Sequence, residues 1–299
     1  MNKDESHPDI GGRSAKFALA ILVVVYVFNF IDRQILSILA EEIQADLGIS
    51  DSGIGFLYGT AFAVFYSVVG IPLGRLADVW TRKNLISIGL ATWSFFTVLS
   101  GTAKSFFFLA FCRIGVGIGE SSASPSAYSL LSDYFSPKVR TTVLAIYSSG
   151  VYIGSGIGLF LGGAIVEYWS TLFPDPSMAP FGIRGWQAAF IAVGLPGLLL
   201  ALVTWQIKEP KRGLSDGIET TQHPHPFKEM LKEMIGLTPF SLMGQEKLAK
   251  NLVVNFSIAL LIFILCFFLS SRTGDIEQWV AFGIGCYLSL IHISEPTRR

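Results

Sequence analysis

Runs of about twenty apolar residues recur along this chain and constrain its fold more than any other feature. An α-helix needs about 20 mainly apolar residues to cross a hydrocarbon core of about 30 Å. The first six runs lie near residues 17–40, 55–73, 84–100, 106–130, 142–168 and 186–207. Two more begin near residues 252 and 278. Short connections between the first six predict antiparallel neighbours. The sequence therefore predicts an all-α integral membrane protein.

A long polar segment, residues 208–250, interrupts the pattern of spans. It contains four prolines and a mixed charge run, and one amphipathic helix is predicted near residues 227–235. Six spans, a long loop and renewed spans match the two-bundle layout of many secondary transporters. We therefore divide the chain into an N-terminal cytoplasmic tail, a six-helix bundle, an inter-domain loop, the start of a second bundle and a C-terminal tail: residues 1–16, 17–207, 208–250, 251–287 and 288–299.

The C-terminal tail turns polar in the middle of the predicted eighth span. Residues 289–299, SLIHISEPTRR, resemble a translated sequencing-adapter sequence, so we expect residues 288–299 to be non-native. The alternative is a genuine short cytoplasmic tail, which would leave the last span too short to cross. On the first interpretation the second bundle is truncated, and the fragment by itself does not transport.

The placement of lysine and arginine predicts the orientation. With the N-terminus in the cytoplasm, fifteen of these residues fall in cytoplasmic segments, and three fall on the opposite side: Lys104, Arg184 and Arg272. Such a bias is typical of the positive-inside rule. We therefore expect a multi-pass protein of the cell's inner (plasma) membrane with a cytoplasmic N-terminus.

Overall charge and cysteine spacing exclude several other classes. The formal net charge is zero, so no basic field favours nucleic acid. The three cysteines have neither metal nor disulfide spacing. We therefore predict no metal, no cofactor and no nucleic-acid partner.

Four charged residues lie inside predicted spans: Asp32 and Arg33 in the first, Arg113 and Glu120 in the fourth. A charge at the centre of a membrane costs at least about 2.5–3.5 kcal/mol, so such groups face a cavity or each other. Guanidinium groups suit carboxylate or phosphate, whereas carboxylates removed from water can exchange protons. We expect Arg33 and Arg113 to bind substrate, and Asp32 and Glu120 to carry a coupling proton. The alternative is an ion-pair set that only joins two helices.

Two further patterns concern helix shape. Four glycines at a spacing of four residues place a small-residue stripe on the fifth span and predict close helix packing: Gly150, Gly154, Gly158 and Gly162. Pro125 and the serines around it predict a kinked, hydroxyl-lined stretch of the fourth span.

Several sequence segments together resemble the Spinster-type branch of the major facilitator superfamily. They are NFIDRQILS (29–37), RIGVGIGESSASPSAYSLLSDYFS (113–136), RTTVLAIYSSGVYIG (140–154), GWQAAF (185–190) and the EPKRG run from Glu209. The resemblance covers nearly all of residues 17–213. It implies a major-facilitator fold with a six-helix N-terminal bundle and an incomplete C-terminal bundle. It also implies proton-linked or facilitated transport of lipid-like substrates, with Asp32 and Glu120 at proton positions and Arg33 and Arg113 at neighbouring cavity positions.

The segment GRLADVWTRK between the second and third spans resembles the cytoplasmic gating loop of the same superfamily. Its expected gating residues are Gly74, Asp78, Arg82 and Lys83. Asp78 would pair with a basic group on a neighbouring helix. Val79 and Thr81 replace an arginine and a glycine of the usual motif, so we expect a weakened latch. The alternative is an ordinary positive-inside loop.

Other functions stay open beside a Spinster-like transporter. Organic-anion/proton symporters of the superfamily also combine an Asp-Arg pair with an Arg and a Glu. Alternatives from other functional classes are a channel and a membrane-embedded enzyme. No histidine lies within the predicted spans, which leaves no catalytic cluster there, so we predict that the protein is not an enzyme. The expected partners are a small or lipid-like solute, protons and membrane lipids, and the complete protein is expected to be a monomer.

Overall fold

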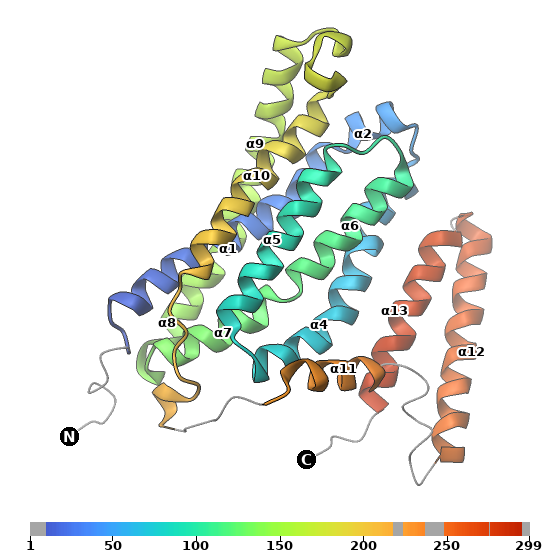
Figure 1. The fold of residues 1–299 in the computed structure, drawn as a ribbon. Helices are drawn as coiled ribbons and strands as arrows, with labels where there is room; N and C mark the ends of the chain where they lie inside the picture. Colours follow the sequence, from blue (N-terminus) through green and yellow to red (C-terminus); the bar gives the residue numbers. More distant parts are fainter. Residues whose placement is uncertain (1–9, 218–223, 237–247, 275, 295–299) are drawn as a thin grey trace.

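The computed structural model describes residues 10–217, 224–236, 248–274 and 276–294, and all regular structure in these ranges is helical. Figure 1 shows one bundle of long helices, with α12 and α13 as a hairpin beside α4. The bundle consists of α1 (Arg13–Ile38), α2 (Ala40–Leu47), α3 (Asp51–Gly55), the π-helical turn η2 (Phe56–Thr60), α4 (Ala61–Val79), α5 (Arg82–Ser100), α6 (Phe106–Glu120), α7 (Ala123–Tyr134), α8 (Pro137–Ser148), α9 (Gly150–Leu172) and α10 (Gly185–Trp205). It is followed by α11 (Pro226–Gly236), α12 (Leu248–Thr273) and α13 (Ile276–Ser294).

Within the described residues, six helical segments are long and apolar enough to cross a membrane. They are Arg13–Ile38, Asp51–Val79, Phe106–Tyr134, Pro137–Leu172, Gly185–Trp205 and Phe256–Thr273. Each coincides with a predicted span, and the all-α membrane fold class is confirmed. The predicted third span is α5, which is helical but less apolar. Its polar residues Ser87, Ser94, Thr97 and Ser100 are buried inside the bundle. Its lower hydropathy therefore reflects a helix enclosed by protein.

The fourth and fifth spans are each built from two helices. The fourth breaks between α6 and α7 at Ser121 and Ser122. Pro125 lacks the N–H that would bond to the carbonyl of Ser121, which explains a break at this place. The predicted kink is therefore present. The fifth span breaks at Ser149, between α8 and α9.

The glycine stripe of α9 lies directly against α1. All four glycines are buried, and their nearest neighbours lie between Val23 and Ile38. A Cβ on Gly158 would come within 3.1 Å of the Ile31 Cα, and one on Gly154 would clash with the Val27 carbonyl oxygen. Without side chains the two backbones approach closely, which is how small residues pack membrane helices.

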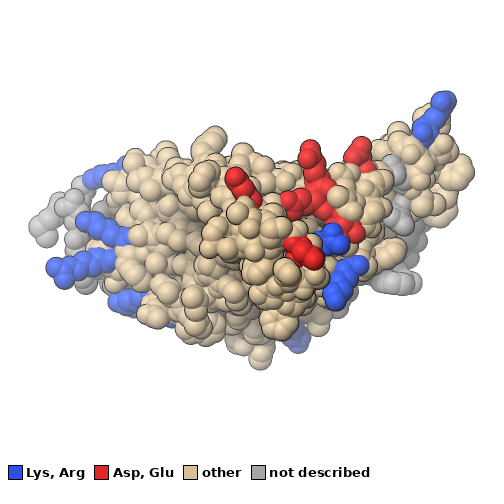
Figure 2. Space-filling model, turned by 90° about the horizontal axis from the view of Figure 1, so that it is seen from above, with Lys and Arg blue, Asp and Glu red and all other residues tan. Residues whose placement is uncertain are grey.

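The end of the bundle that carries α2 is held by polar contacts from the start of α10. Arg184 forms an ion pair with Asp46 at 2.8 Å, and the Trp186 indole N–H donates to the same carboxylate at 2.9 Å. Gln187 donates to the Ala103 carbonyl oxygen at 2.8 Å. The start of α10 is thereby joined to α2 and to the connection between α5 and α6. Viewed from this end, acidic side chains gather in one group, and most of the surface carries no charge (Figure 2).

The second part of the chain begins with α11, which confirms the predicted amphipathic helix. Met230 packs against Leu76 and its neighbours, and Phe227 contacts the Trp80 ring at 5.0 Å between centroids. Helix α13 continues through Ser294, so the polar residues at 289–294 do not end it. Residues 295–299 of the predicted non-native tail lie outside the described residues, and its origin stays a prediction.

We expect Gly154→Ala to lower the free energy of unfolding of the detergent-solubilised chain by about 1–3 kcal/mol, the usual cost of overpacking. The added methyl group would push α9 away from the backbone of α1. The matched control is Gly156→Ala on the same helix, where a Cβ meets nothing within 4 Å. Denaturant titration followed by circular dichroism measures both. Equal stabilities would contradict the role of the stripe.

Candidate functional site

The four charges predicted inside the spans come together where α1 meets α6. Arg33 Nε donates to Glu120 Oε2 at 2.7 Å, which joins two residues 87 positions apart in sequence. The Glu120 side chain is fully buried, whereas the Arg33 side chain is 26% exposed. The ion pair therefore has a buried acid and a partly solvent-exposed base. We call Asp32, Arg33, Arg113 and Glu120 the charged quartet.

Aromatic rings surround the guanidinium group of Arg33. Its central carbon lies 4.9 Å from the ring centroids of Phe62 and Tyr66 and 5.0 Å from that of Phe30. Arg113 lies 5.5 Å from the same Phe62 ring. Arginine is favourable over aromatic faces because their quadrupole is negative there. The rings of α1 and α4 thus hold the positive charges of the quartet where water is scarce.

Asp32 and Arg113 are buried, as is Glu120, so Arg33 is the one partly exposed member of the quartet. Asp32 interacts electrostatically with Glu120 and Arg113, and it faces Thr97 and Trp93 of α5. Because Asp32 and Arg33 are adjacent on one helix, their side chains point about 100° apart. One therefore faces α5 while the other faces α4 and α6.

Several polar atoms of this region have no hydrogen-bond partner among the described residues. They include Asp32 Oδ1, Glu120 Oε1, Arg113 Nε, Asn29 Oδ1, Trp93 Nε1 and Thr97 Oγ1. Such atoms are normally paired in a folded protein, since leaving one buried and unpaired costs about 1–3 kcal/mol. Unpaired buried polar atoms of this kind call for a structural or functional explanation.

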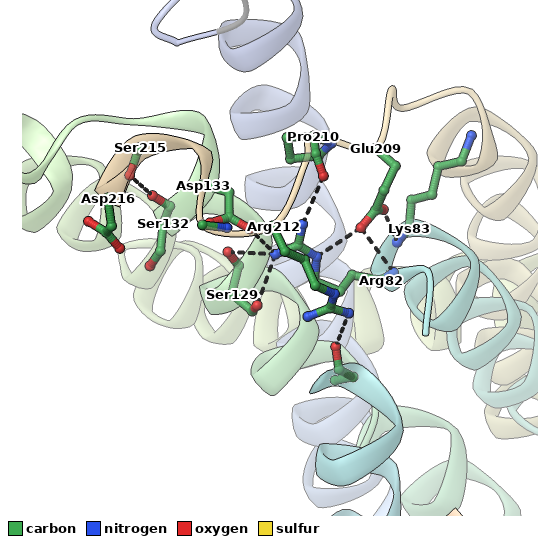
Figure 3. Close-up of polar contacts among 12 residues, drawn as sticks. Arg82, Lys83, Ser129, Ser132, Asp133, Glu209, Pro210, Arg212, Ser215 and Asp216 are labelled. Atoms are coloured by element: carbon green, nitrogen blue, oxygen red, sulfur yellow. Dashed lines mark hydrogen bonds and ion pairs between the residues drawn. The ribbon is translucent and has the colours of Figure 1, made fainter. Parts of the chain in front are cut away.

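A second polar cluster surrounds Arg82 at the start of α5 (Figure 3). Arg82 is fully buried and forms ion pairs with Asp133 of α7 and with Glu209, the latter at 2.8 Å. It also donates to the carbonyl oxygens of Ser129 at 3.1 Å and Pro210 at 3.2 Å. We call this set, with Arg212, the Arg82 cluster.

The segment after α10 closes two helix ends in this cluster. Glu209 accepts from the backbone N–H groups of Arg82 and Lys83, at the N-terminus of α5. Arg212 donates to the carbonyl oxygens of Ala77 and Trp80, at the C-terminus of α4. A negative charge at a helix N-terminus and a positive charge at a helix C-terminus both interact favourably with the helix dipole. Burial and the neighbouring Arg82 charge lower the pKa of Arg212.

The predicted gating residues differ in whether they form polar contacts in the structure. Arg82 is the centre of the cluster, and Lys83 Nζ donates to the Trp205 carbonyl oxygen at 3.2 Å. Gly74 lies on α4, and a Cβ there would meet nothing within 4 Å. Asp78 is exposed and forms no ion pair with any described residue. The acids that pair with Arg82 are Asp133 and Glu209, which sequence reasoning did not assign. Both lie in segments that carry the family resemblance, but no local pattern pairs them with Arg82.

A bundle of membrane-spanning helices with a buried set of acids and bases defines a polytopic membrane protein with an internal polar site. The chain belongs to the Major Facilitator Superfamily, whose family model matches residues 22–294. The predicted family is thereby confirmed.

Three similar proteins narrow the branch. An MFS-type efflux pump of Mycolicibacterium smegmatis is 33% identical over 199 residues, which are 66% of this chain and 43% of the relative. Protein spinster of Drosophila melanogaster is 28% identical over 225 residues, 74% of this chain and 34% of the relative. A crystal structure of a bacterial homologue of the human lysosomal transporter Spinster, inward-facing and occupied, has a TM-score of 0.63 and 27% identity. That match covers 95% of this chain and 73% of the other.

These similarities support the Spinster-like branch of the superfamily, as the sequence segments predicted. The chain spans less than half the length of the two curated relatives.

We expect Asp133→Asn to lower the free energy of unfolding by about 1.5–3 kcal/mol, the contribution of a hydrogen bond to a charged group. Arg82 would lose one of two carboxylate partners in a fully buried place. Asp78→Asn, the matched control from the predicted gating loop, should change stability by less than about 0.5 kcal/mol because Asp78 is exposed. Thermal unfolding in detergent compares the two. A larger effect at Asp78 would reverse the assignment.

Proposed function

We propose that the complete protein is a proton-coupled secondary transporter that moves an anionic or amphipathic small solute by alternating access. The observation that carries this proposal is the buried charged quartet with its unpaired atoms. A membrane protein retains buried charges at a cost, and a buried ion pair contributes little stability. A role in binding and coupling explains why four of them occur together.

Charge balance gives the coupling a physical basis. The quartet contains two acids and two bases, so its formal charge is zero when all four are ionised. An anionic solute that binds Arg33 or Arg113 would leave a net negative charge away from water. Uptake of one proton by Glu120 or Asp32 removes that charge. Solute and proton therefore bind together more easily than either binds alone.

Within this proposal the members of the quartet have distinct roles. Arg113 has a free Nε and offers a planar fork to a carboxylate or phosphate. Arg33 is bound to Glu120 until the solute competes for it. Glu120 then loses its cation and takes the proton. Asp32 is the second proton site and faces Arg113 from α1.

The Arg82 cluster would form the gating element at the opposite end from α2. We propose that Arg82 and Lys83, with Gly74 and Asp78 in the same loop, regulate opening on the cytoplasmic side. The distribution of lysine and arginine supports a cytoplasmic N-terminus and an inner-membrane location. A complete protein with both bundles would work as a monomer. The division of the chain at residues 207/208 and 250/251 belongs to the same proposal.

The substrate class has two candidates. Similarity to Spinster proteins favours a lysolipid-like solute, whereas the quartet alone would also suit a small organic acid, as in organic-anion/proton symporters. A competition experiment separates the two classes. An unlabelled lysophospholipid and a small dicarboxylate are each added as a competitor, and the uptake of the radiolabelled solute is measured. The proposal favours competition by the lysophospholipid.

We expect Glu120→Gln to abolish uptake driven by a pH gradient and to leave solute exchange intact, because exchange needs no net proton movement. Proteoliposomes with the complete two-bundle protein and a radiolabelled lysophospholipid provide both measurements. Glu41→Gln is the matched control, since Glu41 is an exposed acid on α2 outside the quartet. Unchanged gradient-driven uptake in Glu120→Gln would exclude Glu120 as the coupling acid.

A further inference from the structure

A row of four aromatic rings extends from Arg33 across α1, α8 and α7. The Phe30 ring centroid lies 5.0 Å from the Arg33 guanidinium carbon and 5.2 Å from the ring centroid of Tyr26. The Tyr26 ring stacks on that of Tyr147 at 4.3 Å, and Tyr147 meets Tyr128 edge to face at 5.3 Å. We call Phe30, Tyr26, Tyr147 and Tyr128 the aromatic row. Each ring contacts the next, so the row is continuous.

Three members of the aromatic row are accessible from outside the bundle. Tyr128 is 37% exposed, and Tyr26 and Phe30 are half-buried. Tyr147 is buried in the hydrophobic core and supports the row from inside. The hydroxyl groups of Tyr128 and Ser148 are hydrogen-bonded at 3.2 Å, which holds Tyr128 in place. The row therefore presents a fixed apolar surface that ends at Arg33.

The partial exposure of Arg33 indicates that this surface faces a cavity and not lipid. Arg33 bonds to Glu120, which is the middle residue of the span Phe106–Tyr134. A charge at this depth is costly in hydrocarbon, so the accessible part of Arg33 faces a space that water or a solute enters. Tyr26, Phe30 and Arg33 are four and three residues apart and share one face of α1. The accessible rings of α1 therefore face the same space as the arginine.

A guanidinium group at the end of an aromatic row suits an anion with a long apolar body. The guanidinium binds a carboxylate or phosphate, and the rings offer large apolar faces to an alkyl or aromatic group. Tyr26 lies seven residues before Arg33, about 10 Å along α1, and the row continues beyond it to Tyr128. A compact dicarboxylate would contact the arginine and leave most of the row uncovered.

We propose that the aromatic row is the subsite for the apolar body of the transported anion, whose head group binds Arg33. This inference rests on the proposed function, and it selects an elongated amphipathic anion over a compact organic acid. Arg33 is near the end of α1 that leads into α2. The body therefore points away from α2, toward the end of the bundle with the Arg82 cluster. Tyr26 and Tyr128 are specificity-determining residues, because they contact the body and not the head group.

The test measures the equilibrium binding of 8-phenyloctanoate to the complete two-bundle protein in lipid nanodiscs by isothermal titration calorimetry. Empty nanodiscs give the blank for partition of the probe into lipid. We expect saturable binding above this blank. Tyr128→Ala should raise the dissociation constant about tenfold, because the body of the probe loses an aromatic partner. Tyr128→Phe, which keeps the ring and loses the hydroxyl, should bind like the unchanged protein.

The matched control is Tyr152→Ala, because Tyr152 is an 82% exposed tyrosine of α9 outside the aromatic row. Tyr26→Leu is a second variant of the row, measured in the same way in case Tyr128→Ala does not fold. Binding no greater than to empty nanodiscs, an unchanged dissociation constant in both row variants, or an equal loss in Tyr152→Ala would overturn the inference. No proton gradient is applied, so the proposed coupling is tested separately by Glu120→Gln.

Discussion

The cost of holding charge away from water is the constraint on which this structure depends. Asp32, Arg33, Arg113 and Glu120 can stay inside the bundle because α1 and α6 bring opposite charges together and because aromatic rings cover the arginines. That arrangement needs α1 in a fixed position. The glycine stripe of α9 fixes α1 from the other side, where close backbone contact replaces side-chain packing.

The two buried arginine sites differ in how completely they are paired. Arg82 has two carboxylates and two carbonyl oxygens around it, so its donors are well satisfied. Arg113 and both acids of the quartet keep atoms that have no hydrogen-bond partner in the described part of the chain. A fully paired buried polar network favours one arrangement of the chain, whereas an unpaired polar group in the low dielectric of the interior is costly. The proposed roles follow this difference: the Arg82 cluster would hold one arrangement of the chain, and the quartet would exchange partners.

The limits of sequence reasoning follow from the same physics. Features that depend on local patterns could be predicted. They are the spans, the α6–α7 break at Pro125, the amphipathic helix α11 and the four charged residues within apolar runs. The partners of Arg82 could not, because Asp133 and Glu209 lie 51 and 127 positions away and meet it only through helix packing. Asp78 was expected to pair with a basic group on a neighbouring helix, but it is exposed and forms no ion pair with a described residue.

Where the bundle is held also restricts how it can move. One end is joined by Arg184, Trp186 and Gln187, and the other by Arg82, Glu209 and Arg212. Both sets cross between helices that are distant in sequence, so relative sliding of whole helices would break several buried bonds at once. The middle of the bundle has the opposite character, since polar atoms there lack partners. Fewer bonds between the described residues therefore oppose a local rearrangement at the quartet than oppose a displacement at either end of the bundle.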